Sequence, residues 1–359
     1  MGCDTHAMTD TPENPAETTP ESDVEREARA ALDAIPGINW RPFERDDLPA
    51  IAEFYAEVEA FDRKAERTSL SGLQEFWDSP RSVPSEDTLA GYDSDGRVMA
   101  IAWSGCNRSV TERRSVFLGG AVRPDRRGEG IGHAVLAWDI AHGRAWDRAT
   151  REPGFGPLLL RLWCPVDQAD VRDLADRAGL HVERHFFEMS RPLTDVPESV
   201  TPDGIRITGW DPDRTDEVLQ VVNAAFRDHW GYTDASAEMW ADNLAASSFR
   251  SKWSCLAIDE ETDRIVGVAF NCAYEQDWSE DHRGGYTDKL VVLREYRGRG
   301  IAHALLIESM RRFAAASMDA AALGVDAENP SGALGLYESL GYVNTASTCV
   351  HQREEHPAV

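Results

Sequence analysis

Two short glycine turns are the segments of this sequence whose residue types and spacing could do chemistry. The later turn follows the apolar residues 290–293 and opens a helical pattern, and it consists of Arg297, Gly298, Arg299, Gly300, Ile301 and Ala302. The earlier turn has the same arrangement and consists of Arg127, Gly128, Glu129, Gly130, Ile131 and Gly132. Glycines let successive backbone N–H groups point the same way, and the first turn of a helix leaves further N–H groups unpaired. Each segment could therefore cradle a phosphate or pyrophosphate group. On the hexapeptide alone, an ordinary strand-to-helix turn that needs glycine for its dihedral angles is at least as good an interpretation.

An internal repeat explains why the turn occurs twice. Ile38 and Ile205 each begin a short strand pattern that is followed by a helical pattern, and residues 89–103 align without gaps on residues 256–270. Both of these aligned segments consist of two strand-like runs around a polar turn, which is typical of a β-hairpin. Each half is therefore predicted to run strand, helices, hairpin, long strand, glycine turn, helix, strand, helix and final strand.

Composition limits the classes of function. A chain of 359 residues is longer than most single domains, and its formal charge of −26 argues against a sequence-independent nucleic-acid binder. The acidic balance would suit a cationic substrate, although a solvated acidic surface is the simpler interpretation. No stretch approaches the roughly 18–20 apolar residues of a membrane span. The six cysteines form no Cys-x-x-Cys pair and no cluster with histidine at zinc spacing, so we expect buried reduced thiols, no metal site and a cytoplasmic protein. From the charge and the hydropathy we expect neither nucleic acid nor membrane as a partner.

The same patterns divide the chain into parts. Residues 1–37 are predicted to form an acidic, largely disordered tail with a possible short helix over residues 22–34. A first domain is expected over residues 38–190 and a second over residues 205–352, with a proline-rich linker over residues 191–204 between them. The last residues, from His351 onward, are expected to be loose.

The order of elements and two motifs resemble the GNAT superfamily of acyl-CoA-dependent N-acetyltransferases, in tandem duplicate. The first motif, Arg/Gln-x-x-Gly-x-Gly/Ala after the fourth strand, is present in both glycine turns. The second motif joins an Asn-containing turn to a Tyr-bearing helix and a Gly-aromatic pair, and the second half has it as Asn329, Tyr337, Gly341 and Tyr342. The resemblance implies an α+β fold with a mixed α/β sheet, made of two tandem GNAT domains that each have a mixed, mostly antiparallel sheet flanked by helices. Residues 188–197 and 222–226 further resemble the tandem actinobacterial branch that includes mycothiol synthase.

The resemblance also implies acetyl-CoA as the cosubstrate. In GNAT proteins the fourth strand parts from the fifth, and its free backbone binds the pantetheine arm and the acetyl oxygen. Matching this strand to the second half assigns acetyl-CoA binding to the peptide groups of Leu290, Val291 and Val292, to the N–H groups of the later turn, and to Asn329. In the first half the matching residues are Ala121, Val122 and the earlier turn.

The resemblance assigns Tyr337 as the general acid that protonates the departing thiolate. The general base is left open, because the mycothiol synthase branch has a glutamate on the fourth strand where this chain has Tyr286. Since side chains alternate along a strand, Tyr286 and Asp288 are expected to share one face, which makes Asp288 the nearest acid. His229, in an aromatic loop where the family shapes its acceptor pocket, is the second candidate.

The first half departs further from the family pattern. It has Leu118 at the position of Asp288, Asp167 at that of Asn329 and Ala175 at that of Tyr337. We therefore expect chemistry only in the second half, while the first half either binds acetyl-CoA structurally or is an empty remnant. The leading hypothesis is an N-acetyltransferase acting on a primary amine of a small molecule that the sequence does not identify. Mycothiol synthase proper, which Tyr286 disfavours, and a non-catalytic acetyl-CoA sensor are the alternatives, and the chain could be a monomer or a homodimer.

Overall fold

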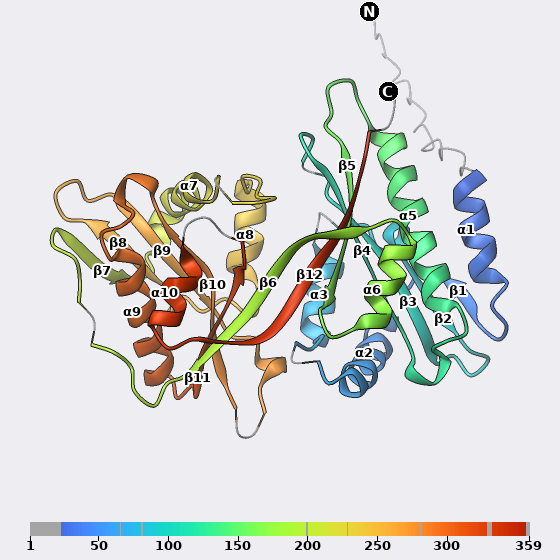
Figure 1. Cartoon of the computed structure of the whole chain (residues 1–359), viewed down its shortest axis with the longest axis horizontal. Helices are drawn as coiled ribbons and strands as arrows, with labels where there is room; N and C mark the ends of the chain where they lie inside the picture. Colours follow the sequence, from blue (N-terminus) through green and yellow to red (C-terminus); the bar gives the residue numbers. More distant parts are fainter. Residues whose placement is uncertain are drawn as a thin grey trace, which may run out of the picture.

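A single mixed sheet of twelve strands runs through both halves of the molecule (Figure 1). The computed structural model describes residues 23–356, apart from positions 65, 80–81, 109, 199, 228, 280–281 and 329–331. The strand order is β1-β2-β3-β4-β5-β12-β6-β11-β10-β9-β8-β7. In chain order the strands are β1 Asn39–Arg41, β2 Thr88–Tyr92, β3 Val98–Cys106, β4 Arg114–Val122, β5 Leu158–Pro165, β6 His181–Pro192, β7 Ile205–Gly209, β8 Cys255–Asp259, β9 Ile265–Cys272, β10 Gly284–Val292, β11 Ala320–Asp326 and β12 Val343–Glu355.

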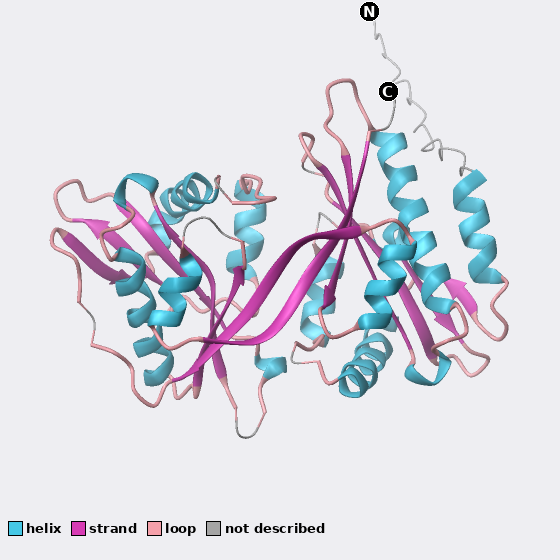
Figure 2. Cartoon of the chain, in the orientation of Figure 1, coloured by secondary structure: helices cyan, strands magenta, loops and turns pink. Residues whose placement is uncertain are grey.

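Helices flank the strands in both halves (Figure 2). In chain order the helices are α1 Asp23–Asp33, α2 Leu48–Asp62, α3 Leu70–Asp78, α4 Pro84–Asp87, α5 Ile131–Thr150, α6 Ala169–Arg177, α7 Thr215–Phe226, α8 Ala237–Ala245, α9 Ile301–Ala315 and α10 Ala333–Ser339. The longer helices bury one apolar stripe against the sheet, as α2 does with Leu48, Ile51, Phe54 and Val58. The predicted α+β class, with a mixed and mostly antiparallel sheet flanked by helices in two repeated halves, is confirmed. None of the described helices is long and apolar enough to cross a membrane.

Each half is completed by a strand from the other half. β12, from the end of the chain, lies between β5 and β6 and pairs with both, while β6, from the first half, pairs with β11 of the second (Figure 1). The expectation of a loose tail from His351 is therefore wrong, since β12 continues to Glu355 and His351 is 1% exposed. This pairing could not be predicted from local patterns, because the partner strand β5 lies far away in the chain.

Several further elements predicted from the sequence can be compared with the structure. Both hairpins are confirmed, as β2 with β3 and as β8 with β9. The short helix is present as α1, which buries Ala28 and Leu32 in the same core as Trp138 of α5. β6 continues to Pro192, two residues into the expected linker. The domain bounds themselves stay a prediction, and residues 1–22 of the acidic tail lie outside the described residues.

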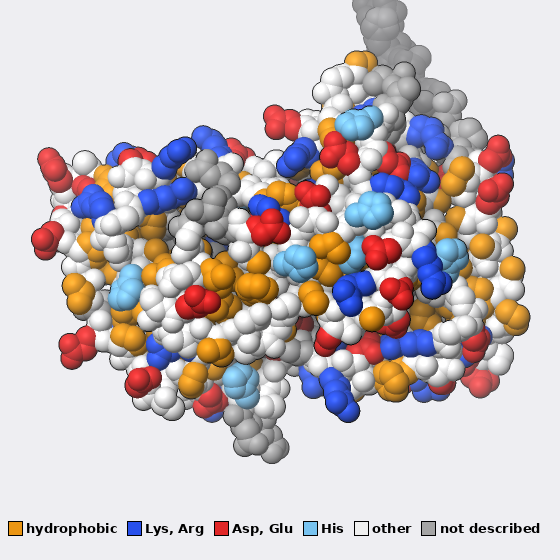
Figure 3. Space-filling model, viewed as in Figure 1, with side chains coloured by type: hydrophobic (Ala, Val, Ile, Leu, Met, Phe, Trp, Pro, Cys, Tyr) orange, Lys and Arg blue, Asp and Glu red, His pale blue; other side chains and the backbone are white. Residues whose placement is uncertain are grey.

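Charged side chains of both signs are mixed on the surface. On the face in Figure 3, Asp and Glu side chains are interspersed with Arg and Lys side chains rather than gathered in one field. The overall acidic charge of −26 therefore marks no binding face on this side of the molecule.

Candidate active site

The second half has a gap in its sheet where β10 and β11 part. These parallel strands pair from Gly284 with Ala320 to Tyr286 with Ala322. Beyond that point β10 continues along β9 to Val292, and β11 continues along β6 to Asp326. One edge of β10 is thus not paired with β11 along Leu290, Val291 and Val292, which the resemblance assigned to acetyl-CoA. Peptide groups on such an edge can bind the amide groups and acetyl oxygen of an acylated pantetheine arm.

The later glycine turn connects this strand to α9. Gly298 and Gly300 have φ angles of 76° and 82°, which favour glycine, and a Cβ at Gly298 would meet nothing within 4 Å. The hydrogen-bond ladder of α9 begins with the Ala304 N–H donating to the Gly300 carbonyl, so the N–H groups before it are available at the helix start. This open surface of amide groups fits a pyrophosphate.

Arg297 fixes the turn to its surroundings. Its Nε donates to the Val292 carbonyl at 3.2 Å, and its Nη2 donates to the Ala225 carbonyl at 2.9 Å at the end of α7. The side chain therefore ties the turn to β10 and to α7. A phosphate bound at the turn would therefore meet this guanidinium mainly through its positive charge and through the loop that it shapes.

The first half keeps the same architecture. β4 and β5 pair from Arg114 to Leu118 and then part, and Gly128 and Gly130 have φ angles of 81° and 85°. Arg127 again ties the turn to its strand, with Nε donating to Val122 and the guanidinium pairing with Asp62 at 2.7 Å. The two glycine turns are thus alike in backbone and in the role of their first arginine.

Asp288 lies on a β-bulge, which the sequence did not reveal. The β9–β10 register shifts between Thr287 and Lys289, so Asp288 is the extra residue of its strand. The alternation argument that put Tyr286 and Asp288 on one face does not hold across such a bulge. Asp288 is exposed, contacts Lys289, and accepts a hydrogen bond from the Tyr274 hydroxyl at 3.4 Å. The comparison with Leu118 is also wrong in detail, because the described β3–β4 pairs pass this point without a shift.

Glu188 of β6 is the carboxylate that meets Tyr286, and sequence reasoning missed it. The Tyr286 hydroxyl donates to Glu188 Oε2 at 3.0 Å across the parting strands. Gly324 of β11 makes room for this contact, since a Cβ there would lie 2.9 Å from Tyr286 Oη and 3.1 Å from Glu188 Oε1. The fourth strand has Tyr286 where the resemblance led us to expect a glutamate, and the carboxylate that meets this tyrosine comes from β6.

The surroundings of Glu188 tune its proton affinity. Burial raises the pKa of Glu188 to about 7, the negative charge of Glu66 adds to the rise, and the hydrogen bond from Tyr286 partly opposes it. The negative charge of Asp288 raises it slightly further. A carboxylate with this pKa is suited to accept a proton near neutral pH.

A second perturbed carboxylate, Asp277, lies on the same side. Burial raises the pKa of Asp277 to about 6, against a hydrogen bond from the Arg67 N–H at 2.6 Å. The negative charges of Glu66 and Glu59 raise it further. Since Arg67, Glu66 and Glu59 belong to the α2–α3 region, the first half contributes both β6 and a loop to this acidic side of the gap.

Tyr337 approaches the gap from the opposite face of the sheet. It lies on α10 in a core with Leu323 and Val325 of β11, whereas Glu188 pairs with Gly324 between them. Because successive residues of a strand face opposite sides, Tyr337 and Glu188 belong to different faces of β11. Burial raises the pKa of Tyr337 to about 12, so its hydroxyl keeps its proton at neutral pH and can donate it.

The remaining predicted residues are distributed as follows. His229 follows α7 and packs edge-on against Phe226 with ring centroids 4.8 Å apart. The next residue, Trp230, lies over the guanidinium groups of Arg161 and Arg184 on β5 and β6. This loop therefore packs across the junction of the two halves. Asn329 lies outside the described residues.

Comparison with known proteins gives a consistent set of relatives. Residues 252–344 match the family model described as an acetyltransferase (GNAT) domain. The chain is 31% identical over 244 residues to a mycothiol acetyltransferase of Thermomonospora curvata, covering 64% of this chain and 71% of that one. It is 30% identical over 236 residues to a mycothiol acetyltransferase of Streptomyces griseus, covering 65% and 70%.

Solved structures with the same fold extend over almost the whole chain. A GCN5-related N-acetyltransferase from Sphaerobacter thermophilus superposes with a TM-score of 0.71 at 23% identity, covering 90% of this chain and 98% of that one. A tandem GNAT protein from the clavulanic acid biosynthesis pathway superposes with a TM-score of 0.66 at 15% identity, covering 90% and 100%. At these identities the two structures show the shared fold.

Proposed function

Because the chain belongs to the GNAT acetyltransferases, in the tandem branch that includes the mycothiol acetyltransferases, we propose that its second half transfers the acetyl group of acetyl-CoA to a primary amine of a small molecule. The observation that carries this proposal is the Glu188–Tyr286 pair beside the gap between β10 and β11. It supplies a general base from β6, although the fourth strand of this half, β10, has a tyrosine where a glutamate was expected. The pair also weakens the sequence argument against the mycothiol precursor as acceptor.

The proposed reaction uses one residue on each face of the sheet. Glu188 takes a proton from the acceptor ammonium group, and the neutral nitrogen attacks the thioester carbonyl carbon. The carbon–sulfur bond breaks as the amide bond forms, and the departing thiolate takes the proton of the Tyr337 hydroxyl. The nitrogen loses its second proton at this step, and that proton returns through solvent to the Tyr337 phenolate. Tyr286 is a positioning residue, because it fixes the Glu188 carboxylate. Asp288 and His229 stay predictions for the base, and Asp288 is a weaker candidate than Glu188 because its carboxylate is already paired with Lys289.

Acetyl-CoA would be held by backbone groups of the second half. The unpaired edge of β10 at Leu290, Val291 and Val292 suits the pantetheine arm and the acetyl oxygen. The N–H groups of the later turn, residues 298–302, suit the pyrophosphate. The thioester is the chemistry that the bound cosubstrate supplies.

The acidic side of the gap favours a cationic acceptor. Glu188, Asp277, Asp288 and Glu66 place several carboxylates around it, and an ammonium ion among them would be attracted electrostatically. Two aromatic hydroxyl groups, from Tyr274 and Tyr286, offer further polar contacts within a partly apolar wall. A small amine with an apolar or sugar body therefore fits better than an acidic one.

The first half is proposed to be a remnant without chemistry. Its parted strand is covered by the chain itself, since Trp103 packs so closely on Gly119 that a Cβ there would lie 2.2 Å from the indole ring. The buried carboxyl group of Asp139, whose pKa burial raises well above the ordinary range, accepts a hydrogen bond from the Gly119 N–H. These contacts compete with a pantetheine arm on β4.

An acetyl-transfer screen tests the proposal. The full chain is incubated with acetyl-CoA and a panel that spans the mycothiol precursor, aminoglycosides, polyamines and amino acids, and thiol release is measured beside the Glu188→Gln variant. We expect release with at least one cationic amine and its loss in the variant. If acetyl-CoA binds tightly but no amine of the panel causes thiol release, the sensor alternative is favoured and the proposal is contradicted.

A further inference from the structure

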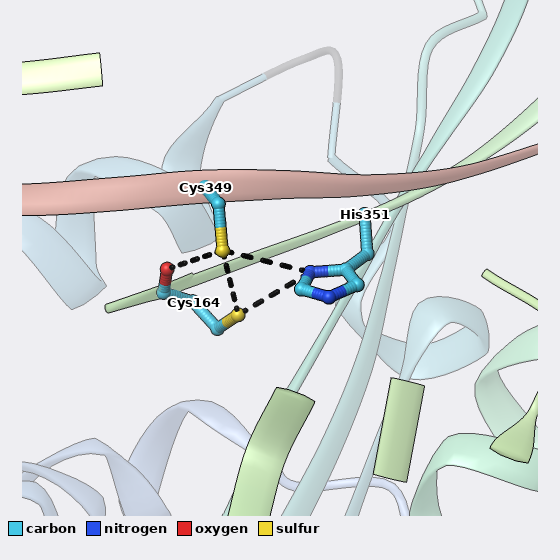
Figure 4. Close-up of side chains that lie close together, drawn as sticks. All are labelled: Cys164, Cys349 and His351. Atoms are coloured by element: carbon cyan, nitrogen blue, oxygen red, sulfur yellow. Dashed lines mark hydrogen bonds between the residues drawn. The ribbon is translucent and has the colours of Figure 1, made fainter. Parts of the chain in front are cut away.

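Three buried side chains with metal-binding atoms converge where the exchanged strand β12 meets β5. Cys349 of β12 pairs directly with Cys164 of β5, and His351 follows on the same face (Figure 4). Each of the three is 1% exposed. The two sulfurs lie 3.6 Å apart, and His351 Nδ1 lies 3.5 Å from Cys164 Sγ and 3.7 Å from Cys349 Sγ.

These spacings match the edges of a coordination tetrahedron. Zinc binds thiolate sulfur at about 2.3 Å and imidazole nitrogen at about 2.0–2.1 Å, so two ligand atoms in tetrahedral geometry lie roughly 3.5–3.8 Å apart. All three measured separations fall in this range. The three atoms therefore surround one point at the distance that a zinc ion requires.

The second half shows that the fold does not need these residue types. Leu162 packs in a core with Ala175 of α6 as Leu323 packs with Tyr337 of α10, so the two strands can be matched. By cross-strand pairing, Cys164 and Cys349 then correspond to Val325 and Phe187, and His351 corresponds to Met189. Where the first half has three metal-binding side chains, the second half has three hydrophobic ones.

We infer that Cys164, Cys349 and His351 form a binding site for a zinc ion that fastens the end of the chain to the sheet of the first half. Two thiols lose their protons on binding, and the two thiolates then balance the charge of the dication in this buried place. The fourth position is left to a water molecule or to the Cys164 carbonyl oxygen, which lies 3.6 Å from Cys349 Sγ.

A carboxylate lies beyond the ring, at ion-pair distance rather than hydrogen-bond distance. Asp176 Oδ1 of α6 lies 3.8 Å from His351 Nε2, on the far side of the imidazole from Nδ1. A metal-binding histidine commonly gives its other N–H to a carboxylate, which fixes the tautomer that presents the free nitrogen to the metal. The spacing rules for zinc motifs could not find this site, because Cys164 and Cys349 are 185 residues apart.

Metal analysis of the full chain tests the site. The protein is purified without chelators, exposed to equimolar zinc, desalted and measured by mass spectrometry of the metal, beside Cys349→Ser and, as a matched control, Cys272→Ser of a buried cysteine in the second half. We expect about one zinc ion per chain in the wild type and the control, and none in Cys349→Ser. A chelator should lower the melting temperature of the wild type.

A cobalt titration of the wild type decides the case if Cys349→Ser fails to fold. Thiolate ligation gives a strong sulfur-to-cobalt absorption band, which we expect at one equivalent and which zinc should abolish. The inference would be overturned by any of three results. These are the absence of this band, zinc that stays bound to folded Cys349→Ser, and a Cys164–Cys349 disulfide in the freshly purified chain.

Discussion

The two halves carry the same backbone but different side chains where their strands part. Matched through Leu162 and Leu323, the second half has Tyr286, Gly324 and Glu188 on the acceptor side. The first half has Phe117, Trp163 and Val350 at the corresponding places. Trp163 packs against Phe186 with tilted rings whose centroids are 4.6 Å apart, at the place that Gly324 leaves open in the other half. A hydroxyl, a space and a carboxylate are thus replaced by two aromatic rings and a valine.

This difference indicates what the strand exchange provides. Glu188 belongs to the first half by sequence, yet it completes the proposed site of the second. The first half would then have kept its fold because the second half depends on its last strand and on its α2–α3 loop. The duplicated chain is interpreted as one active site supported by a copy that has lost its own.

The largest effect is expected from Glu188→Gln. The amide keeps an acceptor for the Tyr286 hydroxyl but cannot take a proton, so turnover should fall about 10²- to 10⁴-fold, the range of general catalysts. Steady-state acetyl transfer measures the effect, with Glu183→Gln on the exposed part of the same strand as the control. Equal rates in the two variants would show that the comparison of halves rests on the wrong residue.

Tyr337→Phe should lower turnover by about one to a few orders of magnitude, because the thiolate would depart without its proton donor. Binding of acetyl-CoA, measured by calorimetry, should change little. A reaction rate equal to that of the wild type would remove Tyr337 from the mechanism. The replacement of Tyr337 by Ala175 would then no longer explain a difference in chemistry between the two halves.

The glycine turns are expected to differ in use although they match in shape. Gly300→Glu brings a negative charge and a strained φ angle to the proposed pyrophosphate site, and should weaken acetyl-CoA binding about tenfold or more. Gly130→Glu carries the same strain in the first half and should leave binding unchanged at one site per chain. Calorimetry that finds two sites, one of them lost in Gly130→Glu, would contradict the empty first half.

Tyr286→Phe should change the pH dependence more than the maximal rate. The Tyr286 hydrogen bond lowers the pKa of Glu188, so its loss should move the acidic limb of kcat/KM to higher pH. A parallel loss of activity at every pH, without a shift, would instead mean that Tyr286 acts only through packing.

Trp163→Ala is expected to have the smallest effect. It opens the first half at the place of Gly324, but leaves Val350 where a base would be needed, so the turnover number should stay within about twofold of the wild type. A melting curve would confirm that the variant is folded. A large loss of activity would mean that the first half takes part in the chemistry.

Local patterns explain what could be predicted from the sequence. The hairpins, the glycine turns and α1 depend on short-range periodicity and turn residues, and the parting of β10 from β11 follows from the resemblance that the turns support. The exchange of β6 and β12 could not be predicted in this way. Strand order depends on contacts between distant segments, which periodicity along the chain does not record.

The same limit hid part of the site. Glu188 meets Tyr286 across 98 residues of sequence, and its only signal was a place in the segment that resembles the mycothiol synthase branch. The bulge at Asp288 was hidden for a different reason, because a single extra residue in one strand leaves no mark in an ungapped alignment. The missed carboxylate of Glu188 and the missed bulge at Asp288 both lie beside the gap between β10 and β11.

The pH dependence of kcat/KM in the wild type, Glu188→Gln and Asp288→Asn tests the central claim most directly. A base must be ionised to act, and burial raises the pKa of Glu188 to about 7, so wild-type activity should rise with pH and level off above this value. We predict that this limb persists in Asp288→Asn and disappears in Glu188→Gln. A limb that persists in Glu188→Gln and disappears in Asp288→Asn would contradict the account.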